Sequence, residues 1–176
     1  MKIGRQDQRS SAISTSNEET ILVRGRDLAR ELIGRITFTE HFWLLVTGSL
    51  PTPGQLRVLD ATLVAIAEHG LVPSVQVSRM TLAAAPEALQ GAVAAGLLGC
   101  GSVVLGSSEA AGRFLAEIGA RGRSAASLEA AAREVVREYR EAEQPIPGYG
   151  HPLHRGGDPR AQRLLEVGRA SCRERV

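Results

Sequence analysis

The sequence predicts an all-α protein, and three observations lead to this fold class. Its 176 residues are 43% hydrophobic but only 3% aromatic, an Ala/Leu/Val-rich profile typical of helical proteins. No segment alternates convincingly between polar and apolar residues over the length of a strand. Apolar residues recur at i, i+3, i+7 and i+10, as the stripe of an amphipathic helix does, at Leu56, Leu59, Leu63 and Ile66.

Start and stop signals divide the chain into an ordered series of helices. The first 20 residues form a polar arm rich in Ser and Thr. Thr39 is the expected cap of a helix that ends at Gly48, and a turn follows over residues 51–54. Gly70 is the expected C-cap of the next helix. The expected helices are 27–33, 39–48, 56–69, 73–84, 87–100, 107–118 and 127–143, with a last one beginning at Pro159.

Charge and cysteine content exclude several classes of protein. The formal net charge of +2 is too small to indicate a nucleic-acid partner, and no basic run is interleaved with aromatic residues. Cys100 lies in an apolar stretch and Cys172 near the last residue, so no disulfide framework is implied. Residues 1–17 are polar and lack an apolar signal segment, so a cytoplasmic protein is the expectation.

The uncharged run from Ala88 to Ser108 is long enough in principle to span a bilayer. Its glycines and serines, together with Gln90, make it only weakly apolar. Tightly packed buried helices explain the run better, and we expect no membrane partner.

The stretch of residues 146–157, called the glycine loop below, concentrates turn formers and two histidines. Pro147 favours an extended backbone at its start. Gly148 and Gly150 allow the backbone to approach a ligand closely.

The glycine loop is followed by a helix start. Asp158 suits the N-cap position and Pro159 the first helical position. Arg160 then lies in the first turn, where free backbone N–H groups favour an anion. A histidine on a glycine loop near such an arginine suits a small polycarboxylate. A Gly/Pro connector before a surface helix explains the same residues, and both interpretations stay open.

Pro-Gly-Tyr-Gly-His at residues 147–151, followed by Asp-Pro-Arg at 158–160, resembles the signature of the citrate synthase family. Members of this family join or split a C–C bond between acetyl-CoA and oxaloacetate. Further segments match in the family's order, namely Val23 to Leu28, Glu31 to Gly34, Gly48 to Thr52 and Ala67 to Leu71.

The resemblance implies a large helical domain followed by the start of a smaller, mostly helical one. After the polar arm of residues 1–20, the large domain would span 21–118, a linker 119–124, and the smaller CoA-side domain 125–167. A homodimer is also implied, and the Gly/Ala-rich helix near Gly91 to Gly99 is a candidate contact.

The resemblance also assigns roles to individual residues. His69 would hydrogen-bond the reacting carbonyl of oxaloacetate, and His151 would polarise that carbonyl and handle the proton on its oxygen. Arg160 would bind a substrate carboxylate. The CoA side of the site would be lined by Gly148, Tyr149 and Gly150. Each charged candidate also has an ordinary structural explanation, a helix C-terminus for His69, a surface loop for His151 and an exposed first turn for Arg160.

The substrates implied by the resemblance are citrate or oxaloacetate and an acyl-CoA thioester. The sequence contains no P-loop, zinc cluster or GxGxxG motif. We therefore expect no metal and no permanently bound cofactor, with the CoA thioester acting as a substrate.

One position departs from the family pattern. Synthases usually carry a catalytic histidine in a Gly-Pro-Leu-His-Gly-Gly stretch, and Val104 occupies its place between Gly101 and Gly106. Valine cannot donate a hydrogen bond to the thioester enolate. The citryl-CoA lyase module of ATP-citrate lyase also lacks this histidine, so the chain resembles a citryl-CoA lyase, which cleaves citryl-CoA to acetyl-CoA and oxaloacetate. The alternatives are a citrate or 2-methylcitrate synthase, and a non-catalytic acyl-CoA-binding or accessory subunit.

Residues 168–176 break the apolar pattern of the final helix and resemble a translated sequencing adapter. We therefore expect the native chain to continue beyond Val167 in a different sequence. The family's catalytic aspartate lies downstream of the Asp-Pro-Arg motif, and no residue here corresponds to it. The 176-residue chain is accordingly expected to be inactive by itself.

Overall fold

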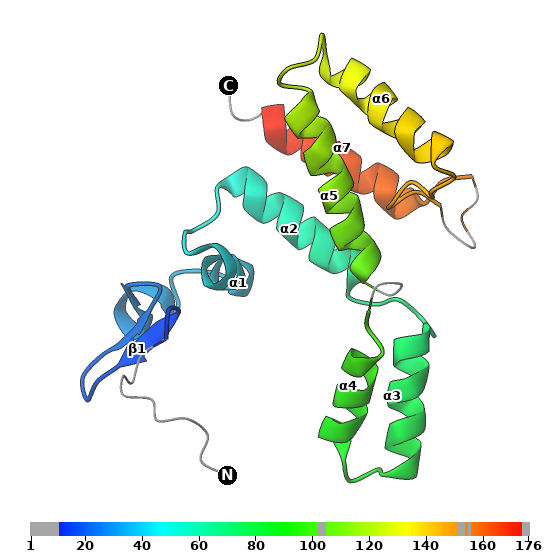
Figure 1. The fold of residues 1–176 in the computed structure, drawn as a ribbon. Helices are drawn as coiled ribbons and strands as arrows, with labels where there is room; N and C mark the ends of the chain where they lie inside the picture. The colour runs from blue at the N-terminus through cyan, green and yellow to red at the C-terminus, as the bar shows by residue number, and fades with distance from the viewer. Residues whose placement is uncertain (1–10, 102–104, 151–153, 155, 174–176) are drawn as a thin grey trace. The chain divides into compact units, whose positions relative to one another are not determined.

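The computed structural model describes residues 11–101, 105–150, 154 and 156–173. Helices form most of this described chain, which confirms the predicted all-α class (Figure 1). The chain divides into two compact units, one made of Met1–Glu68 with Pro159–Val176 and the other of His69–Asp158. The predicted domain boundary at 119–124 stays a prediction.

A small antiparallel sheet opens the described part of the first unit, with the order β1-β2-β3. The strands are β1, Ser14–Ser16, β2, Ile21–Val23, and β3, Arg26–Asp27. The expectation of no strands is wrong at this point. Each strand is only two or three residues long and β1 is exposed throughout, so no alternating pattern exists for the sequence to reveal.

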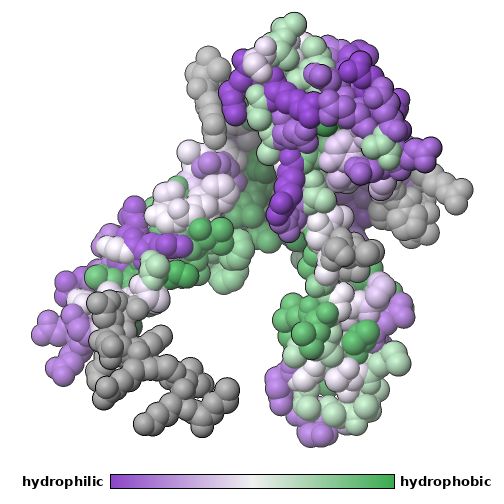
Figure 2. Space-filling model, viewed as in Figure 1, coloured by the Kyte–Doolittle hydropathy of each residue, from purple (hydrophilic) through white to green (hydrophobic). Residues whose placement is uncertain are grey.

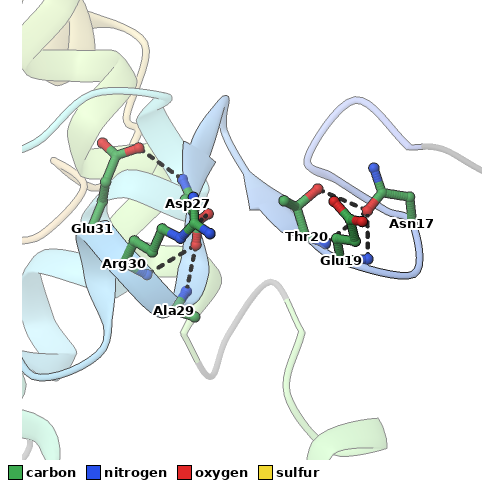
Figure 3. Close-up of polar contacts among 7 residues, drawn as sticks. All are labelled: Asn17, Glu19, Thr20, Asp27, Ala29, Arg30 and Glu31. Carbon is green, nitrogen blue, oxygen red and sulfur yellow. Dashed lines mark hydrogen bonds and ion pairs between the residues drawn. The ribbon is translucent and has the colours of Figure 1, made fainter.

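The polar segment between β1 and β2 is closed by one side chain. Asn17 Oδ1 accepts hydrogen bonds from the amides of Glu19 at 2.9 Å and Thr20 at 2.7 Å (Figure 3). The Thr20 hydroxyl donates to the same oxygen at 2.9 Å. Such local side-chain bonds stabilise a turn where the backbone has no ladder partner.

The short π-helix η1, Leu28–Leu32, follows the sheet and confirms the short helix predicted in this segment. Asp27 Oδ1 accepts hydrogen bonds from the amides of Ala29 and Arg30, both at 2.9 Å. Glu31 Oε1 accepts from the amide of Asp27 at 3.0 Å (Figure 3). These reciprocal caps satisfy backbone donors that a five-residue helix leaves open.

Helix α1, Phe38–Thr47, is capped by Thr37 rather than by Thr39. Thr37 Oγ1 accepts from the amide of Glu40, and Glu40 Oε2 accepts from the amide of Thr37 at 2.7 Å. The prediction of Thr39 as the cap is wrong because only Thr37 has a glutamate three residues later to complete the capping box. The predicted end at Gly48 is confirmed, with φ at 83°. The buried core of this unit consists of Val23, Leu32 and Leu44.

Helix α2, Pro53–Ile66, begins earlier and ends earlier than predicted. Thr52 and Gln55 form a second capping box, and Pro53 takes the first helical position, so much of the predicted turn at 51–54 is a helix start. The helix ends at Ile66, three residues before His69. The predicted helical end at His69 is therefore wrong.

Helix α7, Pro159–Arg173, packs against α2 in the same unit. Its start at Pro159 confirms the prediction. A Cβ on Gly54 would lie 3.0 Å from the carbonyl oxygen of Ser171, so the glycine permits the close approach of the two helices. The prediction that residues 168–176 are not native is untouched by this packing and stays a prediction.

In the second unit, α3, Pro73–Ala84, and α4, Leu89–Leu98, lie side by side (Figure 1). Gly96 allows the close contact, because a Cβ there would overlap the hydroxyl of Ser78. The predicted extent of α3 is confirmed. Within the parts of the chain that the structure describes, no helix is both long and apolar enough to cross a membrane.

Helices α5, Gly106–Arg121, and α6, Leu128–Glu141, pack against each other through a buried core of Phe114, Ile118 and Val135. The rings of Phe114 and Tyr139 meet edge to face, with centroids 5.2 Å apart. Helix α5 continues three residues beyond the predicted end at Ile118, so the first residues of the predicted linker are helical. Ser127 caps α6 by accepting from the amide of Ala130 at 3.0 Å.

Candidate functional site

The glycine loop is described over residues 146–150, 154 and 156–157, and it begins with a tight turn a few residues after α6. The amide of Tyr149 donates to the carbonyl of Ile146 at 3.3 Å. Gly148 and Gly150 have φ values of 81° and 103°, in the left-handed region that favours glycine. The predicted close approach of these two glycines to a ligand stays a prediction.

Gly148 lies directly against helix α5. A Cβ built on Gly148 would be 2.8 Å from Ala111 Cβ, closer than two carbon atoms can lie without one of them moving. The loop and the helix thus meet at two small residues. The run Ala110-Ala111-Gly112 in α5 was the sequence signal for such an approach, and it was missed.

An apolar cavity of about 760 Å³ lies beside the glycine loop, between α5 and α6. Tyr149 is 73% exposed and forms part of its wall, together with Ile146. Glu129 and Arg140 are its charged lining residues. The remaining lining residues are Phe114, Leu115, Ile118, Leu128, Ala132 and Val136. Such a wall can receive an apolar group, and an aromatic ring at the mouth can stack on a planar one.

His69 is exposed and lies between α2 and α3, at the beginning of the second unit. Since α2 ends at Ile66, the imidazole does not belong to the last turn of that helix. A favourable interaction with the helix dipole therefore does not explain why a histidine occupies this position. Gly70, which follows, has φ at 65°. His69 therefore lies in the irregular segment between α2 and α3.

Arg160 is half-buried in the first turn of α7, as the sequence predicted. It belongs to the first unit, whereas His69 and the glycine loop belong to the second. Each of these predicted site residues is therefore described within its own unit. His151 lies outside the described residues, and its predicted role stays a prediction.

The segment of residues 101–106, which contains Val104 in place of the synthase histidine, is described at Gly101, Leu105 and Gly106. The amide of Gly106 donates to the carbonyl of Gly101 at 2.9 Å, which closes the loop ahead of α5. Leu105 has φ at 71°, a conformation that a leucine rarely adopts. Val104 itself lies outside the described residues.

Among the residues that the structure describes, no group of three or more His, Cys, Asp or Glu side chains could hold a metal ion.

Comparison with protein families and their members supports the resemblance. Residues 53–175 match the family model described as "Citrate synthase, C-terminal domain". Citrate synthase 2 of Bacillus subtilis (strain 168) is 29% identical over 128 residues, which are 73% of this chain and 32% of that protein. The chain therefore spans about a third of the length of this curated relative.

Comparison with solved structures supports the predicted citrate synthase-like fold. The structure of citryl-CoA lyase from Hydrogenobacter thermophilus matches with a TM-score of 0.79 and 34% identity, over 92% of this chain and 60% of that one. ATP citrate lyase from Methanothrix soehngenii, in complex with citrate and coenzyme A, matches with a TM-score of 0.78 over 96% of this chain and 26% of that one. At 22% identity the second match shows the fold alone.

Proposed function

This chain belongs to the citrate synthase family, and we propose that it is of the citryl-CoA lyase type, cleaving citryl-CoA to acetyl-CoA and oxaloacetate. The observation that carries the proposal is the 34% identity to a citryl-CoA lyase over 92% of this chain. Val104 supports it by resemblance, because the lyase module of ATP-citrate lyase also lacks the synthase histidine at this place.

The proposed reaction is a retro-Claisen cleavage. A base removes the proton of the citryl hydroxyl, and the bond between the hydroxyl carbon and the acetyl methylene breaks. The hydroxyl oxygen becomes the ketone oxygen of oxaloacetate, and the bonding electron pair becomes the enolate of acetyl-CoA. A proton then adds to the enolate carbon, so the step consumes no oxidant or reductant.

We assign the proton on the citryl oxygen to His151 and a hydrogen bond to the same oxygen to His69. A donor aimed at an oxygen whose charge changes along the reaction is often worth about 3 kcal/mol. Arg160 would pair with a substrate carboxylate through its planar guanidinium. The exposure of His69 and the place of Arg160 in a first helical turn support these assignments.

The CoA thioester is proposed to lie on the side of Gly148, Tyr149 and Gly150. The exposed ring of Tyr149 and the apolar wall beside it support an occupant with a planar, partly apolar group. The solved ATP citrate lyase of Methanothrix soehngenii holds citrate and coenzyme A, in agreement with this choice of substrates.

A homodimer is proposed through the α3–α4 pair. Apolar side chains gather on the exposed surface of these helices (Figure 2). They include Val77, Met80, Leu89, Val93, Leu97 and Leu98. Large apolar side chains exposed together on one pair of helices are a feature of surfaces that a partner covers. A second copy of the chain would cover it.

Two other functions are each favoured by one observation. Similarity to Citrate synthase 2 favours a synthase that condenses acetyl-CoA, or a methyl-branched homologue, with oxaloacetate. The absence of a histidine at Val104 favours a non-catalytic subunit that binds acyl-CoA or pairs with a catalytic partner.

Incubating the full gene product with citryl-CoA distinguishes these three functions. A lyase releases oxaloacetate, measured by NADH oxidation with malate dehydrogenase, and leaves the thioester intact. A synthase hydrolyses citryl-CoA and releases a free thiol. Binding without either product indicates the non-catalytic subunit and contradicts the proposal.

Matched histidine variants test the assigned residue. His151→Ala should abolish turnover, whereas His154→Ala, three residues along the same loop, should retain it. Equal activity of the two variants would remove His151 from the mechanism while leaving the overall reaction measurable in the unsubstituted protein.

A further inference from the structure

We infer that Ala111 is a positioning residue for the glycine loop, and this inference rests on the proposed function. Ala111 lies on α5, outside the loop that carries the proposed site residues, and would act through Gly148. Its contact with Gly148 positions the backbone of residues 148–150, which precede the proposed catalytic residue His151 in the sequence. A small side chain is required at position 111 for this reason.

The contact leaves no room for a side chain at position 148. A Cβ on Gly148 would lie 2.8 Å from Ala111 Cβ and 3.9 Å from its Cα. Gly148 has no side chain that could rotate away, so added volume at position 111 must push the loop backbone itself. The φ of 81° at Gly148 restricts how that backbone can respond.

Two further features bear on the described part of this loop. Ile146 packs against the buried core of Phe114, Ile118 and Val135 and fixes one end. Beyond it, the amide of Tyr149 donates to Ile146 over a long 3.3 Å, and Tyr149 itself is 73% exposed. The contact of Gly148 with Ala111 is therefore one that directly supports the described residues 148–150.

Helix α5 also begins directly after the loop that contains Val104. Ala111 lies five residues after Gly106, about 7.5 Å along the helix axis. The same helix thus carries the contact with Gly148 and begins directly after Leu105.

The test compares Ala111→Val with Ala116→Val in the full gene product. Ala116 is exposed on the same helix, so both variants add the same atoms at a similar cost in helix propensity. We expect Ala111→Val to lower kcat for citryl-CoA cleavage by about 10- to 100-fold, because a misplacement of about 1 Å costs this much. KM and the thermal midpoint should stay close to those of Ala116→Val, and Ala111→Ser should retain kcat.

A second readout does not depend on activity. Amide hydrogen exchange over residues 146–150 should be faster in Ala111→Val than in Ala116→Val, because the loop loses its packing contact with α5. If the unsubstituted protein cleaves no citryl-CoA, the proposed function fails, and exchange alone decides the inference. Equal exchange in the two valine variants overturns it, as does a fall in kcat that both variants share.

Discussion

Arg121 and Glu138 form a bidentate pair that joins α5 to α6. Nη1 of Arg121 lies 2.6 Å from Oε1 of Glu138, and Nη2 lies 2.8 Å from Oε2. The same guanidinium donates to Glu117 at 2.5 Å within α5. Fork-to-fork geometry of this kind orients both helices as well as attracting them.

Replacing this arginine should lower the thermal midpoint. Arg121→Ala removes a pair between helices, whereas the control Arg133→Ala removes an exposed pair with Glu129 inside α6. Because the Arg121 network is also solvent-accessible, we expect a fall of only about 3 °C, with almost none for the control. Equal midpoints in the two variants, measured by calorimetry, would contradict the role of the pair between helices.

The carboxyl of Glu138 should make stability depend on acid pH. The hydrogen bond from Arg121 is the largest cause that holds the pKa of Glu138 below its ordinary value of 4.5. A depressed folded-state pKa contributes stability above the unfolded pKa, and this contribution is lost as pH falls through the folded value. The difference in stability between unsubstituted protein and Glu138→Gln should therefore shrink below about pH 4.5.

Urea unfolding at a series of pH values measures this effect. In an Arg121→Ala background the pH-dependent difference caused by Glu138→Gln should largely vanish, since its first cause is gone. A difference that is the same at every pH would show that the pair does not titrate as expected.

The capping box of α1 distinguishes two neighbouring threonines. Thr37→Ala should destabilise the protein by about 1 kcal/mol, because the hydrogen bond to the amide of Glu40 is lost. Thr39→Ala should be neutral or slightly stabilising, since Thr39 lies inside the helix and alanine is the better helix former. Chemical denaturation of both variants measures the contrast, and the reverse order would contradict the observed cap.

The α3–α4 surface should control assembly. Leu98 is 87% exposed at the end of α4, and Leu98→Glu should convert a dimer into a monomer at low micromolar concentration. Val64→Glu is the matched control, because Val64 is 80% exposed on α2 in the other unit. Sedimentation velocity gives the answer. A monomeric unsubstituted protein, or equal behaviour of both variants, would contradict the proposed interface.

Several helices could be predicted because their signals are local. Pro73 sets the start of α3, Ser127 caps α6 and Gly48 ends α1, and each acts through residues within one turn. The family assignment also came from short motifs. The errors lie where two local signals compete, as for Thr37 and Thr39. They also lie where a helix ends before the glycine that was expected to terminate it, as α2 ends at Ile66 rather than next to Gly70.

The residue types of the candidate site could be predicted from the sequence, but the secondary structure around each residue could be predicted only in part. Arg160 lies in a first helical turn as expected, whereas His69 lies in the irregular segment after α2 instead of at a helix end. Its chemistry came from resemblance, since a lone histidine or arginine has no local pattern that reveals a ligand.

By itself, the sequence determined the helical class, most helix positions and the family. Only the tertiary structure decided the pairing of the short strands, the apolar cavity between α5 and α6 and the meeting of Ala111 with Gly148. The reason is physical. Helix caps and periodicity act between residues within a turn, while these three features join residues that the chain separates and that only packing brings together.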